Sequence, residues 1–165
     1  MIEKFLLILS NLPKEIVILI LSALPISELR GAIPIGISVY KMGILKTILL
    51  SLIGNFSFVI PFLLFLNHLH RYFMKFKWYN KFFNWWSTKV LSKTKNIEKY
   101  EYIGLAIFVG IPFPATGAWS GCLASYLLKL NFWKSVLSIF VGIIIACVIV
   151  TITTVGATQI IDFIK

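Results

Sequence analysis

The sequence is poor in charge, and above all in acidic residues. Only 13% of its 165 residues are charged, and six of those are Asp or Glu. Hydrophobic residues make up 59% and the mean hydropathy is +0.91, whereas soluble domains are near half apolar and a quarter charged. These proportions exclude an ordinary soluble domain and indicate an integral membrane protein. A chain of this length has room for one compact membrane domain, and we expect no separate catalytic domain.

Cysteine and histidine are scarce as well. Cys122 and Cys147 lie in apolar segments without CxxC spacing or a nearby histidine, which argues against a zinc site or a disulfide framework. There is no HExxH motif and no clustered pair of aspartates. We therefore expect no enzyme, no catalytic residue, no metal and no cofactor. His68 and His70 follow an apolar run, and we interpret them as interfacial side chains that face water instead of relaying protons.

Near its start, the sequence contains an acid and a base within an apolar segment. The stretch ALPISELRGAIPIG places Glu28 and Arg30 between Pro25 and Pro34. Holding two ionisable groups at this depth costs roughly 2.5–3.5 kcal/mol each on insertion scales. We therefore favour a functional role for them over a purely structural one, in which Glu28 would complement a helix dipole and Arg30 would be its partner.

The apolar segments around this stretch are too short to cross a bilayer alone. The arm over 14–24 covers about half of a ~30 Å hydrocarbon core at about 1.5 Å per residue. Pro25 then breaks the helix, Ser27 is the predicted N-cap, and a second arm runs over about 29–40. Two half-length arms that meet at a polar tip predict a re-entrant hairpin. The segment 44–66, with a kink at Pro61, is long enough to be a true span.

The segment 68–101 is aromatic and basic. Residues at alternating spacings of four and three predict one aromatic helix face: Tyr72, Phe76, Tyr79, Phe83, Trp86 and Val90. The basic residues are Arg71, Lys75, Lys77, Lys81, Lys89, Lys93, Lys95 and Lys99. We expect an amphipathic interfacial helix that contacts anionic lipid head groups, and no nucleic acid. A shorter interfacial helix is expected over 2–11, in place of a cleaved signal peptide.

The second half of the chain repeats the order of the first. In YIGLAIFVGIPFPATGAWSGCLASYLLKL a short arm ends before Pro112 and Pro114, and a second arm follows to about Leu128. A final span covers 135 to about 160. At an offset of 88 the pattern K-x4-K-x7-G recurs: Lys41, Lys46 and Gly54 align with Lys129, Lys134 and Gly142. Internal repeats with broken helices are typical of transporters.

These observations predict an all-α integral membrane protein with two inverted repeats. Each repeat is a re-entrant helical hairpin plus one transmembrane helix. The single domain 1–165 contains repeat 1 over about 14–67, the linker over about 68–101 and repeat 2 over about 102–161. One crossing per repeat would invert the second, so that the two tips meet near the bilayer midplane.

We expect the substrate to bind where the tips meet. The candidate residues are Glu28, Arg30, Pro25, Pro34, Pro112, Pro114, Thr116, Gly117 and Trp119. At the second tip, Gly110, Gly117 and Gly121 could serve close helix packing only. Thr116 and Trp119 could either line the cavity or pack against neighbouring helices.

The distribution of positive charge predicts a cytoplasmic linker in a multi-pass protein of the plasma membrane, because cytoplasmic loops carry excess Lys and Arg. The same rule holds if 16–40 and 102–128 cross fully as kinked helices, so a four-span alternative stays open. Cysteines placed at positions 41 and 129 would label from opposite sides in the hairpin arrangement and from the same side in the four-span arrangement.

Two of the stretches resemble a known family. LPISELRGAIPIG and IPFPATGAWSG resemble the hallmark stretches ELRGAIP-x-G and P-x-P-x-TGAW-x-G of the putative small multi-drug export protein family, in the same order. This resemblance implies efflux. More distantly, the proline-flanked hairpins look like those of the DedA (VTT) membrane proteins, which implies inverted re-entrant loops and movement of phospholipids or polyprenyl-phosphate carriers. The DedA-type motif E-x-x-x-P-x-P is missing from the first half.

We therefore expect a small transporter that moves an amphipathic or anionic lipid-like substrate by alternating access. The alternative is a membrane-shaping or assembly factor that acts through the basic helix. Membrane lipids are the expected partners, while coupling to protons or ions and homo-oligomerisation stay open.

Overall fold

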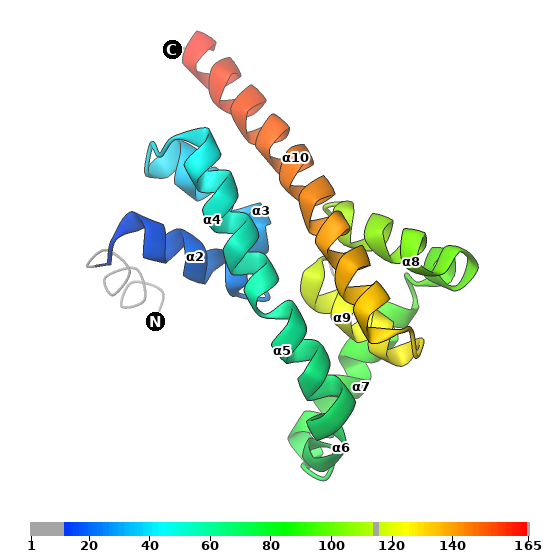
Figure 1. Cartoon of the computed structure of the whole chain (residues 1–165). Helices are drawn as coiled ribbons and strands as arrows, with labels where there is room; N and C mark the ends of the chain where they lie inside the picture. The colour runs from blue at the N-terminus through cyan, green and yellow to red at the C-terminus, as the bar shows by residue number, and fades with distance from the viewer. Residues whose placement is uncertain (1–11, 114–115, 165) are drawn as a thin grey trace. The chain divides into compact units, whose positions relative to one another are not determined.

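The computed structural model describes residues 12–113 and 116–164, and every regular element in these ranges is helical (Figure 1). The described residues form two compact units. The first unit runs to Asn55 and resumes at Cys147, and the second is Phe56–Ala146. The helix expected over 2–11 and the candidate residue Pro114 lie outside the described residues.

The first unit contains a helical hairpin whose two arms match the predicted ones. Helix α2 spans Lys14–Ala23, α3 spans Glu28–Pro34, and the π-helical turn η1 continues over Ile35–Val39. The arms pack on each other through a cluster that contains Val17, Ile18, Leu21 and Ala32. The predicted break at Pro25 is confirmed, because the chain between Ala23 and Glu28 is a turn.

Two helices among the described residues are long and apolar enough to cross a membrane, Ile44–Phe73 and Phe132–Ile160. The first is divided into α4 (Ile44–Ser57), α5 (Val59–Leu64), the π-helical turn η2 (Phe65–Leu69) and α6 (His70–Phe73). Its break falls at Phe58, where the ring of Pro61 opposes a regular helix because it clashes with the carbonyl four residues before it. The second belongs to α10, Phe132–Ile164. The all-helical class is thus confirmed.

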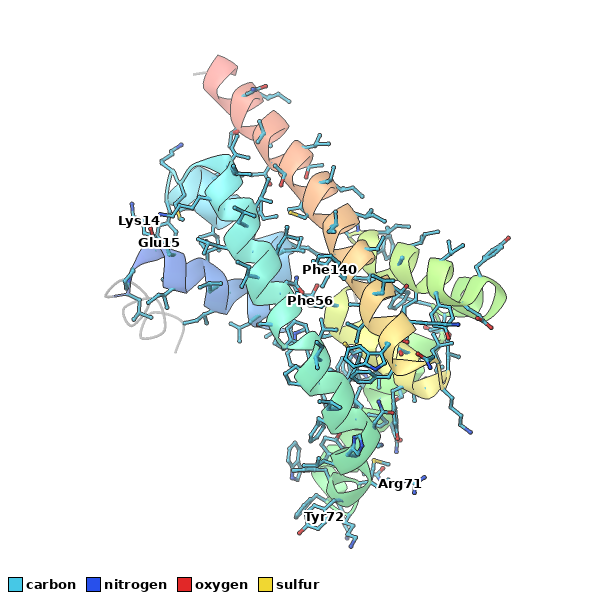
Figure 2. All side chains as sticks on the ribbon, in the orientation of Figure 1. Lys14, Glu15, Phe56, Arg71, Tyr72 and Phe140 are labelled. Carbon is cyan, nitrogen blue, oxygen red and sulfur yellow. The ribbon has the colours of Figure 1, made fainter. Side chains whose placement is uncertain are left out.

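The second unit contains α5 to α9 and the first part of α10. Helix α7 spans Lys77–Leu91, α8 spans Lys95–Gly110 and α9 spans Ala118–Leu127. Figure 1 shows α8 and α9 beside the N-terminal part of α10. The ring of Phe140 on α10 lies 4.9 Å from that of Phe56 in an edge contact, and both residues are labelled in Figure 2.

Residues related by the offset of 88 have the same local geometry in the two halves. Lys41 and Lys129 both have left-handed backbone, with φ of 51° and 54°. The hydroxyl of Thr47 donates to the Gly43 carbonyl (3.1 Å), and that of Ser135 donates to Asn131 (2.8 Å).

The glycines of the two spans are matched as well. Gly54 lies against Leu19 and Ser22 of α2, and Gly142 lies against Ala106 and Val109 of α8. In both cases a span contacts the first arm of its hairpin through a glycine, which allows close backbone approach. The inversion of one half relative to the other stays a prediction.

Helix α7 carries the later part of the predicted aromatic face, whose first members, Tyr72 and Phe76, precede the helix and are exposed. Phe83 and Val90 of that face are buried in the second unit, and the exposed aromatic face consists of Trp78, Phe82 and Trp85. The spacing of four and three fits both faces, so periodicity alone could not decide which one packs inward.

His70 differs from the prediction as well. Its side chain is buried, its Nδ1 lies 3.0 Å from the Tyr79 hydroxyl, and its ring is 4.0 Å from that of Phe83. The expectation that it faces water was wrong for His70, whereas His68 is exposed and its contact with water stays a prediction. Interior packing by α7 removes His70 from solvent.

Candidate functional site

The first hairpin tip holds its acid in a strained backbone. Pro25 and Ile26 are exposed, Ile26 to 98%, and the chain then turns inward at Glu28. Glu28 has a φ of 46°, a left-handed value that is uncommon for residues other than glycine. Its side chain is only 6% exposed. Strained, buried polar residues of this kind cluster at functional sites.

Ser27 occupies the predicted N-cap position, yet it does not cap α3. Its hydroxyl donates back to the carbonyl of Leu21 on α2. The bond ties the turn to the first arm and leaves the start of α3 without a side-chain cap. The prediction that the Ser27 side chain caps α3 was therefore wrong, because the turn directs its hydroxyl toward α2 instead.

Arg30 follows Glu28 by two residues and carries the opposite charge. The Glu28 carboxylate interacts electrostatically with the half-buried guanidinium of Arg30. The predicted acid and base therefore act on each other electrostatically.

Pro34 ends α3 and begins an irregular segment. After it the helix widens into η1, where the Tyr40 amide donates to the Ile35 carbonyl five residues back. π-helical turns are rare and frequently mark functional sites. A cavity of about 290 Å³ lies beside it within the first unit, lined by Pro34, Ser38, Thr153, Thr154, Ala157 and Thr158.

A buried polar stripe on α4 was missed by sequence analysis. Thr47, Ser51 and Asn55 recur every four residues and are at most 1% exposed. Ser51 Oγ and Asn55 Oδ1 have no hydrogen-bond partner within the part of the chain that the structure describes. Buried polar atoms normally have partners. The spacing of four in an otherwise apolar span was the signal that could have revealed the stripe.

The second tip is built around Thr116 and Gly117. The Thr116 hydroxyl lies within hydrogen-bond distance of two acceptors, the carbonyls of Ile111 (2.8 Å) and Phe113 (2.7 Å), on either side of the exposed Pro112. Gly117 has a φ of 122°, which glycine adopts without strain. This assigns Gly117 to the turn, whereas Gly110 and Gly121 serve close packing.

Trp119 packs at the start of α9. Its ring stacks on Phe58 at 4.2 Å and meets Phe62 at 4.5 Å. Of the two open roles for Trp119, the structure documents the packing one.

Lys93 of the linker joins the second tip. Its Nζ lies 5.0 Å above the ring of Phe113, and both residues line a cavity of about 200 Å³ with Thr116. A cation beside a tip hydroxyl is suited to binding an anionic group. From the sequence, Lys93 was expected in the head-group region, and its contact with the tip was not predicted.

The described residues contain no group of three His, Cys, Asp or Glu side chains placed to hold a metal ion. The chemistry available is an acid–base pair at one tip, and a hydroxyl with a nearby lysine at the other.

Together, the helical fold with its two membrane-length helices and the ionisable hairpin tip define a small helical membrane protein. The family described as "Putative small multi-drug export protein" matches residues 28–149, and the chain belongs to this family. The match begins at Glu28, after the exposed Pro25 of the first tip, and includes the second tip. No curated protein and no solved structure matches the chain significantly.

Proposed function

We propose that this chain is a multi-pass transporter that moves an amphipathic, anionic lipid-like substrate across the plasma membrane by alternating access. The substrate would bind where the two hairpin tips meet, each tip entering from its own leaflet as part of an inverted repeat. Residues 1–165 then act as one membrane domain, with the basic linker 68–101 on the cytoplasmic side. The family membership supports export as the general activity.

The observation that carries this proposal is the geometry of Glu28. A carboxylate that is 6% exposed, in strained backbone and paired electrostatically with Arg30, costs stability that a structural role does not require. Ionisable residues within membrane segments commonly mark substrate or ion pathways. In the proposed mechanism Arg30 binds the anionic group of the substrate, and Glu28 is its counter-ion in the empty state.

The matched hairpins support the proposed repeat. Equal left-handed turns at Lys41 and Lys129 and equivalent glycine contacts at Gly54 and Gly142 are expected of two copies of one structural unit. In this proposal each copy contributes one hairpin and one span.

The test of the substrate site is Glu28→Gln in proteoliposomes that contain a fluorescent phosphatidylglycerol analogue. The substitution keeps the size of the side chain and removes its charge, so we expect at least a tenfold slower transfer between leaflets at unchanged expression. Glu15→Gln is the matched control, since Glu15 is an exposed acid in an ion pair on α2. Wild-type transfer by Glu28→Gln would refute the assignment.

The re-entrant arrangement has a separate test. Single cysteines at positions 41 and 129, in a background with Cys122→Ala and Cys147→Ala, should react with an impermeant maleimide from opposite sides. Labelling from the same side would replace the hairpins by four full spans.

A second candidate function rests on the exposed face of α7. Trp78, Phe82 and Trp85 lie exposed on the same helix as Lys77 and Lys81, a combination that binds membrane surfaces. If the chain shapes membranes instead of transporting lipid, reversing the charge of both lysines should abolish vesicle deformation, and Glu28→Gln should have no effect on it.

A further inference from the structure

A groove between α8 and α10 in the second unit has a lining of its own and shares only Ile107 with the cavity at the second tip. Its volume is about 460 Å³, within the 300–1,000 Å³ typical of ligand sites. One end is formed by Tyr102 and Lys134, and its walls include Ile107, Leu137, Val141 and Ile145.

The groove follows the axis of a membrane-length helix. Lys134 lies two residues after the start of α10 at Phe132, and Ile145 lies about 16 Å further along the helix at about 1.5 Å per residue. The apolar wall side chains are open to the surroundings, with Leu137 at 64% exposure and Val141 at 41%. The groove therefore has a basic end near the start of the span and an apolar body toward its middle.

The basic end differs from its counterpart in the first half. Lys46 forms an ion pair of 2.6 Å with Glu15, whereas Lys134, at the equivalent position, lies 5.5 Å above the ring of Tyr102. Within the described ranges no ion pair is recorded for Lys134. No carboxylate among the described side chains neutralises its positive charge, which favours an anionic occupant.

From this complementarity we propose that the groove binds one anionic phospholipid, with the head-group phosphate at Lys134 and an acyl chain along Leu137, Val141 and Ile145. The positive charge of Lys134 favours a phospholipid with net negative charge, and the apolar walls contact its acyl chain. Lys134 is not among the residues of the proposed transport site, and this proposal does not rest on the proposed function.

The experiment is native mass spectrometry of the delipidated full chain, titrated with palmitoyl-oleoyl-phosphatidylglycerol or palmitoyl-oleoyl-phosphatidylcholine. We expect one phosphatidylglycerol to bind more tightly than phosphatidylcholine. Lys134→Ala should weaken phosphatidylglycerol binding about fivefold, as expected for one basic side chain at an anionic lipid, and leave phosphatidylcholine binding unchanged. Lys134→Arg should retain the preference, and the matched control Lys46→Ala should bind as the wild type does.

The apolar body has its own test. Val141→Trp fills the groove from an exposed position and should weaken binding of both lipids, with circular dichroism confirming its helical content. Wild-type affinity in Lys134→Ala, or an equal loss in Lys46→Ala, would overturn the proposed head-group site. Unchanged lipid binding by a folded Val141→Trp would overturn the placement of the chain.

Discussion

Replacing the span glycines by alanine tests whether both hairpins are held against their spans by the same close contact. A Cβ added at Gly54 would lie 2.5 Å from the backbone oxygen of Leu19. A Cβ added at Gly142 would lie 2.7 Å from the backbone oxygen of Ala106. Because these neighbours are backbone atoms, no rotation of a side chain relieves the clash, and the arm must shift away from the span.

The expected magnitude follows from two opposing effects. Alanine is favoured over glycine in a helix by about 1 kcal/mol, and overpacking costs about 1–3 kcal/mol. With a backbone clash the upper part of that range applies, so we expect Gly54→Ala and Gly142→Ala each to lower the free energy of unfolding by about 1–2 kcal/mol. Gly156→Ala, where no atom lies within 4 Å of the added Cβ, should instead raise it by about 1 kcal/mol.

The assay is thermal unfolding in one detergent, followed by circular dichroism. At about 2–4 °C per kcal/mol for a chain of this size, the two clashing variants should melt about 2–8 °C below the wild type and Gly156→Ala about 2–4 °C above it. The opposite signs separate the packing effect from the change in helix propensity. A rise in Tm for either Gly54→Ala or Gly142→Ala would refute the close contact at that position.

Three further predictions concern individual contacts. Lys46 lowers the pKa of Glu15 by hydrogen bonding. The stabilisation by this ion pair should therefore be present at neutral pH and lost as the pH falls through the lowered pKa. The difference in Tm between the wild type and Lys46→Ala should disappear in acid and in high salt. His70→Phe should lower the free energy of unfolding by roughly 1–3 kcal/mol, because the Tyr79 hydroxyl loses a buried hydrogen-bond partner. Adding Tyr79→Phe to this variant should restore part of the lost stability. Fully additive effects of the two substitutions would contradict the hydrogen bond. Trp119→Ala should lower the free energy of unfolding by about 3–5 kcal/mol, measured by thermal unfolding. Trp119→Phe should be tolerated because it keeps an aromatic ring. An equal loss of stability in both variants would argue against ring stacking.

The breaks and spans of the fold could be predicted from the sequence because they depend on local chemistry. Pro25 and Pro112 cannot continue a helix, and the apolar run after Ile44 has the length of a bilayer crossing. The offset of 88 was visible in only a few residues, yet Lys41 and Lys129 have the same left-handed backbone. A lysine does not favour such a value, so the match is a property of the turn and not of the residue.

The parts that could not be predicted depend on which face packs inward. The aromatic positions of α7 fit two faces, and burial of Phe83 left Trp85 outside. The strain at Glu28 is equally hidden, because an acid after Ser27 reads as an ordinary first-turn residue. Tertiary packing decides such questions, and a single sequence carries little information about it.

The two halves have matching backbone geometry but differ in the side chains at equivalent positions. At the turn into each span a lysine contacts the start of the first arm, through Glu15 in one half and through Tyr102 in the other. At the tips, the first half has a strained acid at Glu28, while the second has the hydroxyl of Thr116 at the equivalent position. If both tips only held the fold together, equal chemistry at both would suffice. We therefore expect the difference at matched positions to reflect selection for function as opposed to folding, and Glu28→Thr is the substitution that would make the tips alike and remove the acid at once.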